Sequence, residues 1–205
     1  MTPSIQDIML AAPVIPVLVI DDASHARPIA EALVSGGLRT LEVTLRTTAA
    51  LDVIREMKQV PGAIVGAGTV TNADEFDAAL KAGSEFIVSP GLTENLARVV
   101  ASHGLPFLPG IATASDIMRG LDLGLTHFKF FPALASGGLP ALRALAGPFG
   151  QCRFCPTGGI RQDTAAEWLV EDFVLCVGGS WIVPAGPPDL PAIEQAARKA
   201  SELPA

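Results

Sequence analysis

Residues 40–91 read TLEVTLRTTAALDVIREMKQVPGAIVGAGTVTNADEFDAALKAGSEFIVSPG, in which three short apolar runs are separated by two longer stretches of helical periodicity. The apolar runs cover residues 40–45, 64–70 and 86–91, and Gly, Pro, Ser or Thr stand at the transitions. Short apolar runs bounded by turn residues predict buried strands, and the amphipathic stretches 48–60 and 72–82 predict helices. This part of the chain is therefore expected to alternate strand and helix, as parallel sheets do.

The same alternation continues over the whole chain. Eight strand candidates begin 20 to 26 residues apart, which is the length of one strand and one helix. We therefore expect an α/β protein whose residues 1–205 form a single (β/α)8 TIM barrel domain, with an N-terminal helix over about 5–12 and a C-terminal helix over about 190–203. The other strand candidates are 14–20, 106–112, 127–133, 153–160 and 175–183, and the other helix candidates are 24–35, 93–103, 114–123, 139–146 and 163–170.

An open doubly wound sheet is the alternative architecture. Such a sheet would more naturally carry a Gly-x-Gly-x-x-Gly turn after its first strand, where this chain has Asp21, Asp22, Ala23 and Ser24. The regular spacing without long insertions favours the barrel.

The composition excludes several classes of protein. Hydrophobic residues make up 49% of the 205 residues and charged residues only 17%, which excludes intrinsic disorder. With 14 Lys and Arg against 21 Asp and Glu, the formal net charge is −7, and the basic residues are scattered. Neither a nucleic acid nor an anionic membrane is therefore expected as a partner.

Neither the cysteines nor the N-terminus suggests metal binding or export. Cys152, Cys155 and Cys176 lack the second pair of ligands that a zinc site needs, and the three histidines are dispersed, so we expect reduced thiols and no metal. The apolar N-terminus carries no Lys or Arg and is interrupted by Asp7, unlike a signal peptide. We expect a cytoplasmic protein.

Glu42 is the first candidate for chemistry. Period-two alternation over residues 40–46 places Leu41 and the other apolar residues on the face toward the helices. Glu42 then points into the barrel, with Arg46 at its upper rim.

Lys129 is the second candidate. In HFKFFPA (127–133), the same alternation sends Phe128 and Phe130 to the helices and places Lys129 and Phe131 in the interior. An apolar environment favours the neutral amine, which is the nucleophile that forms a Schiff base with a ketone. The alternatives are a purely structural ion pair with Glu42, or an ammonium group that reaches solvent at the barrel mouth.

Two glycine pairs suggest an anion site. Thr157, Gly158 and Gly159 follow the seventh strand candidate, and Gly178, Gly179 and Ser180 end the eighth. Barrels commonly bind phosphate with the loops after these two strands, where backbone N–H groups converge. The alternative for either pair is a tight turn that only glycine permits.

Thr69 and Pro90 lie at two further strand ends. The Thr69 hydroxyl is suited to a carboxylate, and the alternative is that it caps the helix expected near residue 72.

The motifs at these strand ends resemble those of one enzyme family. EVTLRT, GAGTV, SPG, LPGIAT, FKFFPA, PTGGI and VGGSW, in this order between about residues 5 and 186, are similar to the motifs of 2-keto-3-deoxy-6-phosphogluconate (KDPG) aldolases, the class I aldolases of the Entner–Doudoroff pathway.

The resemblance implies a role for each candidate. Lys129 would form the Schiff base and Glu42 would be the general acid/base. Four residues would hold the pyruvate part of the substrate, and five would contact the sugar hydroxyl and the phosphate. The resemblance also implies no cofactor, a homotrimer and possible cleavage of 4-hydroxy-2-oxoglutarate. The residues that would hold the pyruvate part are Arg46, Thr69, Pro90 and Phe131. The residues that would contact the hydroxyl and the phosphate are Thr157, Gly158, Gly159, Gly179 and Ser180.

The chain departs from the family pattern at three positions, and three further functions are alternatives to cleavage of the gluconate substrate. Leu134, Ala114 and Arg161 stand where the family often has Glu, Pro and Thr, which affects the rim of the site but removes no catalytic group. Cleavage of the galactonate epimer is one alternative. An isomerase or epimerase that binds phosphate without an imine and a non-catalytic phosphosugar-binding protein are two others.

Overall fold

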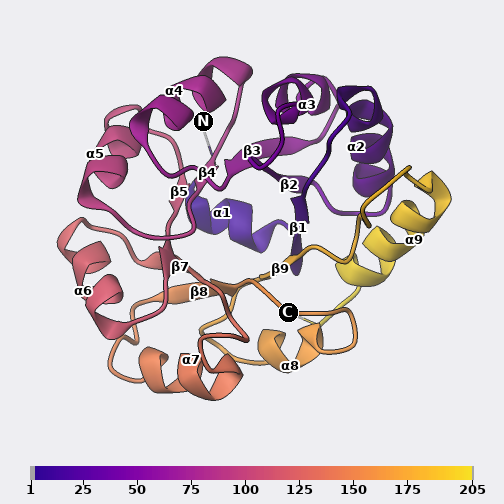
Figure 1. The fold of residues 1–205 in the computed structure, drawn as a ribbon. Coiled ribbons are helices and arrows are strands. Elements are labelled where there is room, and N and C mark those ends of the chain that lie inside the picture. Colours follow the sequence, from indigo (N-terminus) through magenta and orange to yellow (C-terminus); the bar gives the residue numbers. More distant parts are fainter. Residues whose placement is uncertain (1–2, 205) are drawn as a thin grey trace.

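A computed structural model describes residues 3–204, and its strands lie at the centre of a ring of helices (Figure 1). The paired strands all run parallel. The strands are β1 Val14–Leu18, β2 Thr40–Thr44, β3 Ile64–Gly68, β4 Ile87–Val88, β5 Phe107–Leu108, β6 Gly110–Ile111, β7 His127–Phe130, β8 Arg153–Pro156 and β9 Val177–Gly179. The helices are α1 Ile5–Leu10, α2 Ala26–Ser35, α3 Ala50–Met57, α4 Ala73–Ala82, α5 Glu94–Ser102, α6 Ala114–Asp122, α7 Gly138–Ala146, α8 Ala165–Leu169 and α9 Leu190–Ser201.

The strands form two curled parallel sheets. One has six strands in the order β5-β4-β3-β2-β1-β9, and the other has three in the order β6-β7-β8. Isolated parallel bridges join Phe154 to Val174 and Thr157 to Gly178, so the end of β8 lies beside β9. The α/β class with a parallel sheet, predicted from the alternation of strands and helices, is confirmed.

The prediction of one continuous strand over residues 106–112 is wrong. The segment is divided into β5 and β6 at Pro109, which has no N–H to donate to a strand ladder. The Pro109 carbonyl still accepts a hydrogen bond of 2.8 Å from the backbone N–H of Lys129. The boundary between the two sheets therefore falls beside the strand that carries the candidate lysine.

The helices lie where the periodicity predicts them, and all but α7, which begins one residue early at Gly138, are shorter than expected. The helix expected over 24–35 begins with a 3-10 turn, Ala23–His25, capped by the side chain of Asp22, and becomes α-helical at Ala26. Thr93 and Asp189 cap α5 and α9 by accepting a backbone hydrogen bond in the first turn. The N-terminal helix ends at Leu10 and the C-terminal helix at Ser201, in place of the expected 12 and 203.

The apolar side chains of the strands form two clusters. The larger lies between the strands and the surrounding helices and includes Leu41, Val43, Phe128 and Phe130, which confirms the faces predicted from period-two alternation. The smaller lies on the other face of the strands and contains Ile8, Met9, Ile15, Phe86, Val88, Leu108, Cys155 and Cys176.

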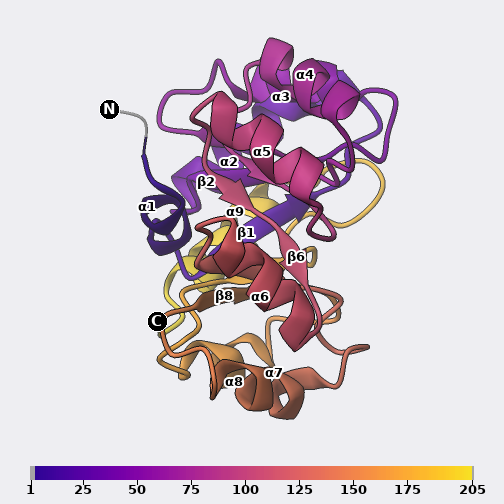
Figure 2. The ribbon, with the colours of Figure 1, turned by 90° about the vertical axis from the view of Figure 1, so that its left-hand side faces the viewer.

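Helix α1 covers the amino ends of the strands (Figure 2). Its residues Ile8 and Met9 are buried in the smaller cluster, and the hydroxyl of Thr40, the first residue of β2, donates to the Ile8 carbonyl at 3.3 Å. The interior is thus closed by apolar side chains at one end, which leaves the carboxyl ends of the strands for polar groups.

Among residues 3–204, none of the helices has the length and apolar character needed to cross a bilayer.

His127, the first residue of β7, is expected to make stability depend on pH. Burial, and to a smaller extent the positive charge of Arg153, lower the pKa of His127 below its usual 6.5. The folded protein therefore keeps this imidazole neutral at pH values where the unfolded chain protonates it. The free energy of unfolding should then fall as the pH drops below about 6.5.

This expectation is tested by urea denaturation of the wild type and His127→Gln between pH 5 and pH 8. The variant should lose stability less steeply on acidification. Equal slopes for the two proteins would show that His127 does not contribute.

Candidate active site

Lys129 and Glu42 meet in the interior of the fold. The Nζ atom of Lys129 lies 3.0 Å from Oε1 of Glu42, and the two residues are only 4% and 2% exposed. The ring centroid of Phe131 is 5.3 Å from the same Nζ. Because Lys129 is buried, its amine does not reach solvent at the mouth. The Lys129 amine and the Glu42 carboxylate are thus at ion-pair distance, which is also short enough for a proton to pass directly between them.

Two cysteines lie near this pair in an apolar setting. Burial, then the neighbouring Cys155 and the negative charge of Glu42, raise the pKa of the Cys176 thiol well above its usual value. Cys176 is therefore a neutral thiol that packs as a small apolar group. Within residues 3–204, no group of three or more His, Cys, Asp and Glu side chains is arranged to hold a metal ion.

Arg46 and Thr69 come together at the ends of β2 and β3. The Nε of Arg46 donates a hydrogen bond of 3.3 Å to the Thr69 hydroxyl. Thr69 has a φ of 62°, a left-handed conformation that is rare for a β-branched residue and costs about 1–3 kcal/mol. Such strain is concentrated at functional sites.

The helix-capping alternative for Thr69 is wrong. Asn72 caps α4 by accepting a hydrogen bond of 2.9 Å from the backbone N–H of Glu75. Thr69 is therefore free to hold Arg46.

The segment after β8 forms a turn that depends on glycine. Gly158 and Gly159 have φ values of 106° and 80°, which favour residues without a Cβ. The Gly158 carbonyl accepts a hydrogen bond of 3.1 Å from the N–H of Leu134, and the Leu134 side chain lies against Gly159. Because glycine has no side chain, the backbone N–H groups of such a turn can approach an anion closely.

Thr157 is buried beside this turn. Only 6% of the residue is exposed, and its N–H donates to the Phe130 carbonyl at 2.9 Å. Gly178 on β9 leaves room for the Thr157 side chain. A Cβ at position 178 would overlap the Thr157 hydroxyl and lie 2.7 Å from the Thr157 methyl group.

The predicted site residues share one end of the fold. Each lies within three residues of the carboxyl end of its strand, and in parallel strands these ends form a common edge. Phe131 is half-buried next to Lys129, whereas Pro90, Arg46 and Ser180 are exposed.

Sequence reasoning missed Gly68, which faces Glu42, and it placed Gly178 in an anion site, whereas the structure shows that Gly178 makes room for Thr157. The sequence signal for Gly68 is its position two residues after Gly66, since every second residue of a strand faces the same side.

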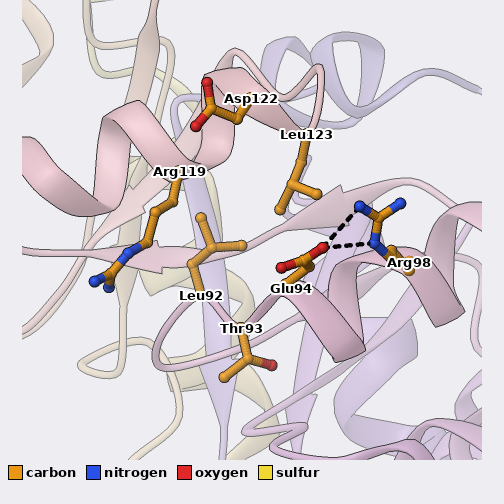
Figure 3. A pocket seen from close by; sticks show the side chains of 7 residues that line it. All are labelled: Leu92, Thr93, Glu94, Arg98, Arg119, Asp122 and Leu123. Atoms are coloured by element: carbon orange, nitrogen blue, oxygen red, sulfur yellow. Dashed lines mark hydrogen bonds and ion pairs between the residues drawn. The ribbon is translucent and has the colours of Figure 1, made fainter.

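A surface hollow of about 560 Å³ lies apart from these residues, between the start of α5 and the end of α6 (Figure 3). Arg98 and Glu94 form two hydrogen bonds of 2.9 and 2.7 Å across its rim. None of the predicted site residues lines it, so it is not part of this site. Its lining is Leu92, Thr93, Glu94, Arg98, Arg119, Asp122 and Leu123.

A parallel α/β fold with a buried lysine–carboxylate pair near the strand ends has the two groups that an aldolase of the lysine-dependent class, a carbon–carbon lyase, needs. The comparison with protein families agrees, because the model for KDPG and KHG aldolases matches residues 5–196. The chain belongs to the KDPG and KHG aldolase family.

Individual relatives cover nearly the whole chain. A 2-dehydro-3-deoxy-phosphogluconate aldolase of Zymomonas mobilis is 58% identical over 197 residues, which cover 96% of this chain and 95% of that protein. The structure of the Zymomonas mobilis ZM4 enzyme with 3-phosphoglycerate has a TM-score of 0.97 at 56% identity, covering 99% and 97% of the two chains. A KDPG aldolase from Legionella pneumophila, with pyruvate captured as a covalent carbinolamine, has a TM-score of 0.95 at 41% identity, covering 98% and 100%.

Removing one member of the buried pair should destabilise the fold. Lys129→Met leaves the Glu42 carboxylate without its partner, which is expected to cost about 3 kcal/mol or more of unfolding free energy at neutral pH. Adding Glu42→Gln removes the unpaired charge, so the double variant should recover much of that loss. Chemical denaturation of the wild type, both single variants and the double variant measures this coupling, and additive effects would contradict it.

Proposed function

We propose that this protein is a class I aldolase that reversibly cleaves 2-keto-3-deoxy-6-phosphogluconate to pyruvate and D-glyceraldehyde 3-phosphate. The observation that carries the proposal is the buried 3.0 Å contact between the Lys129 amine and the Glu42 carboxylate. The names of the relatives support the same reaction.

The first stage is formation of the imine. Lys129 first passes a proton to Glu42 across their 3.0 Å contact, and the resulting neutral amine attacks the keto carbon, C2. Glu42 then transfers this proton to the oxygen that develops there. Loss of water from this carbinolamine gives an iminium ion, and Glu42 again carries the proton. The contact between the two groups allows these transfers without movement of either strand.

The second stage is cleavage of the bond between C3 and C4. Glu42, directly or through a water, removes the proton of the C4 hydroxyl, whose electrons form the aldehyde of D-glyceraldehyde 3-phosphate. The electrons of the broken bond pass to the iminium nitrogen and leave an enamine. Glu42 then protonates C3, and water hydrolyses the imine to pyruvate and free Lys129. The iminium is the electron sink, so this route uses no metal or organic cofactor.

The remaining residues position the substrate. Arg46 and Thr69, already hydrogen-bonded to each other, bind the pyruvate carboxylate, and Pro90 and Phe131 line the apolar side of the pyruvate pocket. Thr157 contacts a sugar hydroxyl. The phosphate is bound by backbone N–H groups of Gly158, Gly159, Gly179 and by Ser180.

The architecture and setting of the protein are proposed on the same basis. We infer that the two sheets close into one (β/α)8 barrel that forms a single domain. The bridge between Thr157 and Gly178 and the succession of β5 and β6 across Pro109 support this closure. We also propose a cytoplasmic homotrimer, with 4-hydroxy-2-oxoglutarate cleavage as a side activity.

Trapping of the imine tests the proposed chemistry. Borohydride reduction in the presence of pyruvate should inactivate the enzyme and attach one reduced pyruvate to Lys129, as peptide mass spectrometry will show. Glu42→Gln should lower turnover about 10²- to 10⁴-fold in an assay coupled to lactate dehydrogenase.

Lys58→Met is the matched control, because Lys58 also pairs with a glutamate, Glu85, at 2.7 Å but on the surface. This variant should keep both the adduct and the activity. An isomerase or epimerase without an imine would stay unmodified and active after reduction, and a binding protein would release no pyruvate. Either result would overturn the proposal.

Thr157 is expected to favour the gluconate substrate over its galactonate epimer. Thr157→Val removes one hydroxyl at a buried position, so the ratio of kcat/KM for the two epimers should fall about three- to tenfold. Thr157→Ser keeps the hydroxyl and should retain most of the preference. Identical ratios in the wild type and Thr157→Val would exclude Thr157 from specificity.

A further inference from the structure

Gly68, the last residue of β3, lies directly against the carboxylate of Glu42. In the parallel pairing of β2 and β3, Gly68 is opposite Thr44 and Gly66 is opposite Glu42, so the Glu42 side chain extends along β3 toward Gly68. A Cβ at position 68 would overlap Oε1 of Glu42 and lie 2.7 Å from its Cγ and 2.8 Å from its Cδ. Distances of this size are far inside van der Waals contact.

The backbone does not require glycine at this position. The φ angle of Gly68 does not lie in the left-handed region, and its carbonyl accepts an ordinary hydrogen bond of 2.8 Å from the N–H of Leu45. An alanine could adopt this conformation. Glycine is therefore needed at position 68 for the space that it leaves and not for the conformational freedom of its backbone.

The Glu42 carboxylate has little room to move aside. Its Oε1 is 3.0 Å from Lys129 Nζ, and the residue is only 2% exposed. The other interior glycine of β3, Gly66, is covered by the ring of Phe86. Any group added at position 68 must displace the carboxylate, and with it the contact with Lys129.

The geometry points to Gly68 as a positioning residue for the acid/base chemistry: the absence of a side chain holds the Glu42 carboxylate within proton-transfer distance of Lys129. This inference rests on the proposed function, since it assigns a purpose to the geometry of the same site. The three atoms nearest to a Cβ at position 68 all belong to Glu42, so the role assigned to Gly68 acts through Glu42.

Gly68→Ala should slow the proton transfers that Glu42 makes and leave the equilibrium amount of imine little changed. Exchange of the pyruvate methyl hydrogens with D2O, followed by NMR, reports transfer of protons to and from the enamine by Glu42. A displacement of the carboxylate by about 1 Å is expected to slow this exchange about 10- to 100-fold. The fraction of enzyme trapped by borohydride at saturating pyruvate should stay within about twofold of the wild type, because Lys129 itself is unchanged.

Gly66→Ala is the matched control. It adds the same methyl group to the same face of β3 two residues earlier, where the three nearest atoms all belong to the Phe86 ring, at 2.5 Å, and not to the Glu42 side chain. Overpacking should make both variants less stable. Per folded molecule, only Gly68→Ala should lose exchange activity.

The outcomes separate this inference from the proposed function. If the wild type traps and exchanges pyruvate while Gly68→Ala exchanges at the wild-type rate, or both glycine variants are slowed alike, the positioning role is wrong and the proposed function stands. If the wild type shows neither trapping nor exchange, both are wrong.

A second pair of variants covers the case in which Gly68→Ala does not fold. Glu42→Ala removes the overlapped carboxylate, so Glu42→Ala with Gly68→Ala should be about as stable as Glu42→Ala alone in chemical denaturation. A double variant that folds where Gly68→Ala alone does not would support the contact between residues 42 and 68. A double variant that also fails to fold would show that β3 itself needs the glycine, and it would overturn the inference.

Discussion

The contact between Lys129 and Glu42 is the constraint on which the rest of the structure depends. The two residues are 87 positions apart in the chain, and they lie on β2 of the six-stranded sheet and β7 of the three-stranded sheet. Removing both groups from water is costly, and packed apolar residues would fill the same space at no such cost. The sheets must curl toward each other for the two strands to face across the interior. The pair thus links the overall curvature of the fold to the chemistry at its centre.

Small residues make this pair and its surroundings possible. The amino end of the interior is filled by apolar side chains from α1 and the strands, whereas toward the carboxyl end the facing positions include Gly68 and Gly178. These two glycines leave the volume that Glu42 and Thr157 occupy. Close packing permits few voids, so a long polar side chain inside a ring of strands needs a residue without a side chain opposite it. The interior is therefore asymmetric, with a stabilising apolar half and a polar half that carries the site.

An anionic substrate suits this site although the chain as a whole is acidic. The formal net charge is −7, but the groups at the carboxyl ends of the strands include Arg46, Lys129 and the N–H groups of the glycine turns. At physiological ionic strength, charges more than about 8 Å away are largely screened, so the local groups dominate binding. Arg161, which follows the Gly158–Gly159 turn, is paired with Asp163 at 3.1 Å. The charge of Arg161 is thus compensated at the rim. This departure from the family pattern therefore leaves the catalytic groups unaffected.

The sequence by itself determined the alternation of strands and helices, the face on which each strand residue lies, and the family. Period-two and helical periodicities are local properties, so the interior positions of Glu42 and Lys129 could be predicted from a few neighbours in the chain. The tertiary structure alone decided the 3.0 Å distance between them, the hydrogen bond from Arg46 to Thr69, and the interruption of the strand at Pro109. It also decided that Asn72 and not Thr69 caps α4, and that Gly68 and Gly178 make room for other side chains. These features depend on contacts between residues distant in the chain or on the backbone conformation of single residues, and neither leaves a periodic pattern in the sequence.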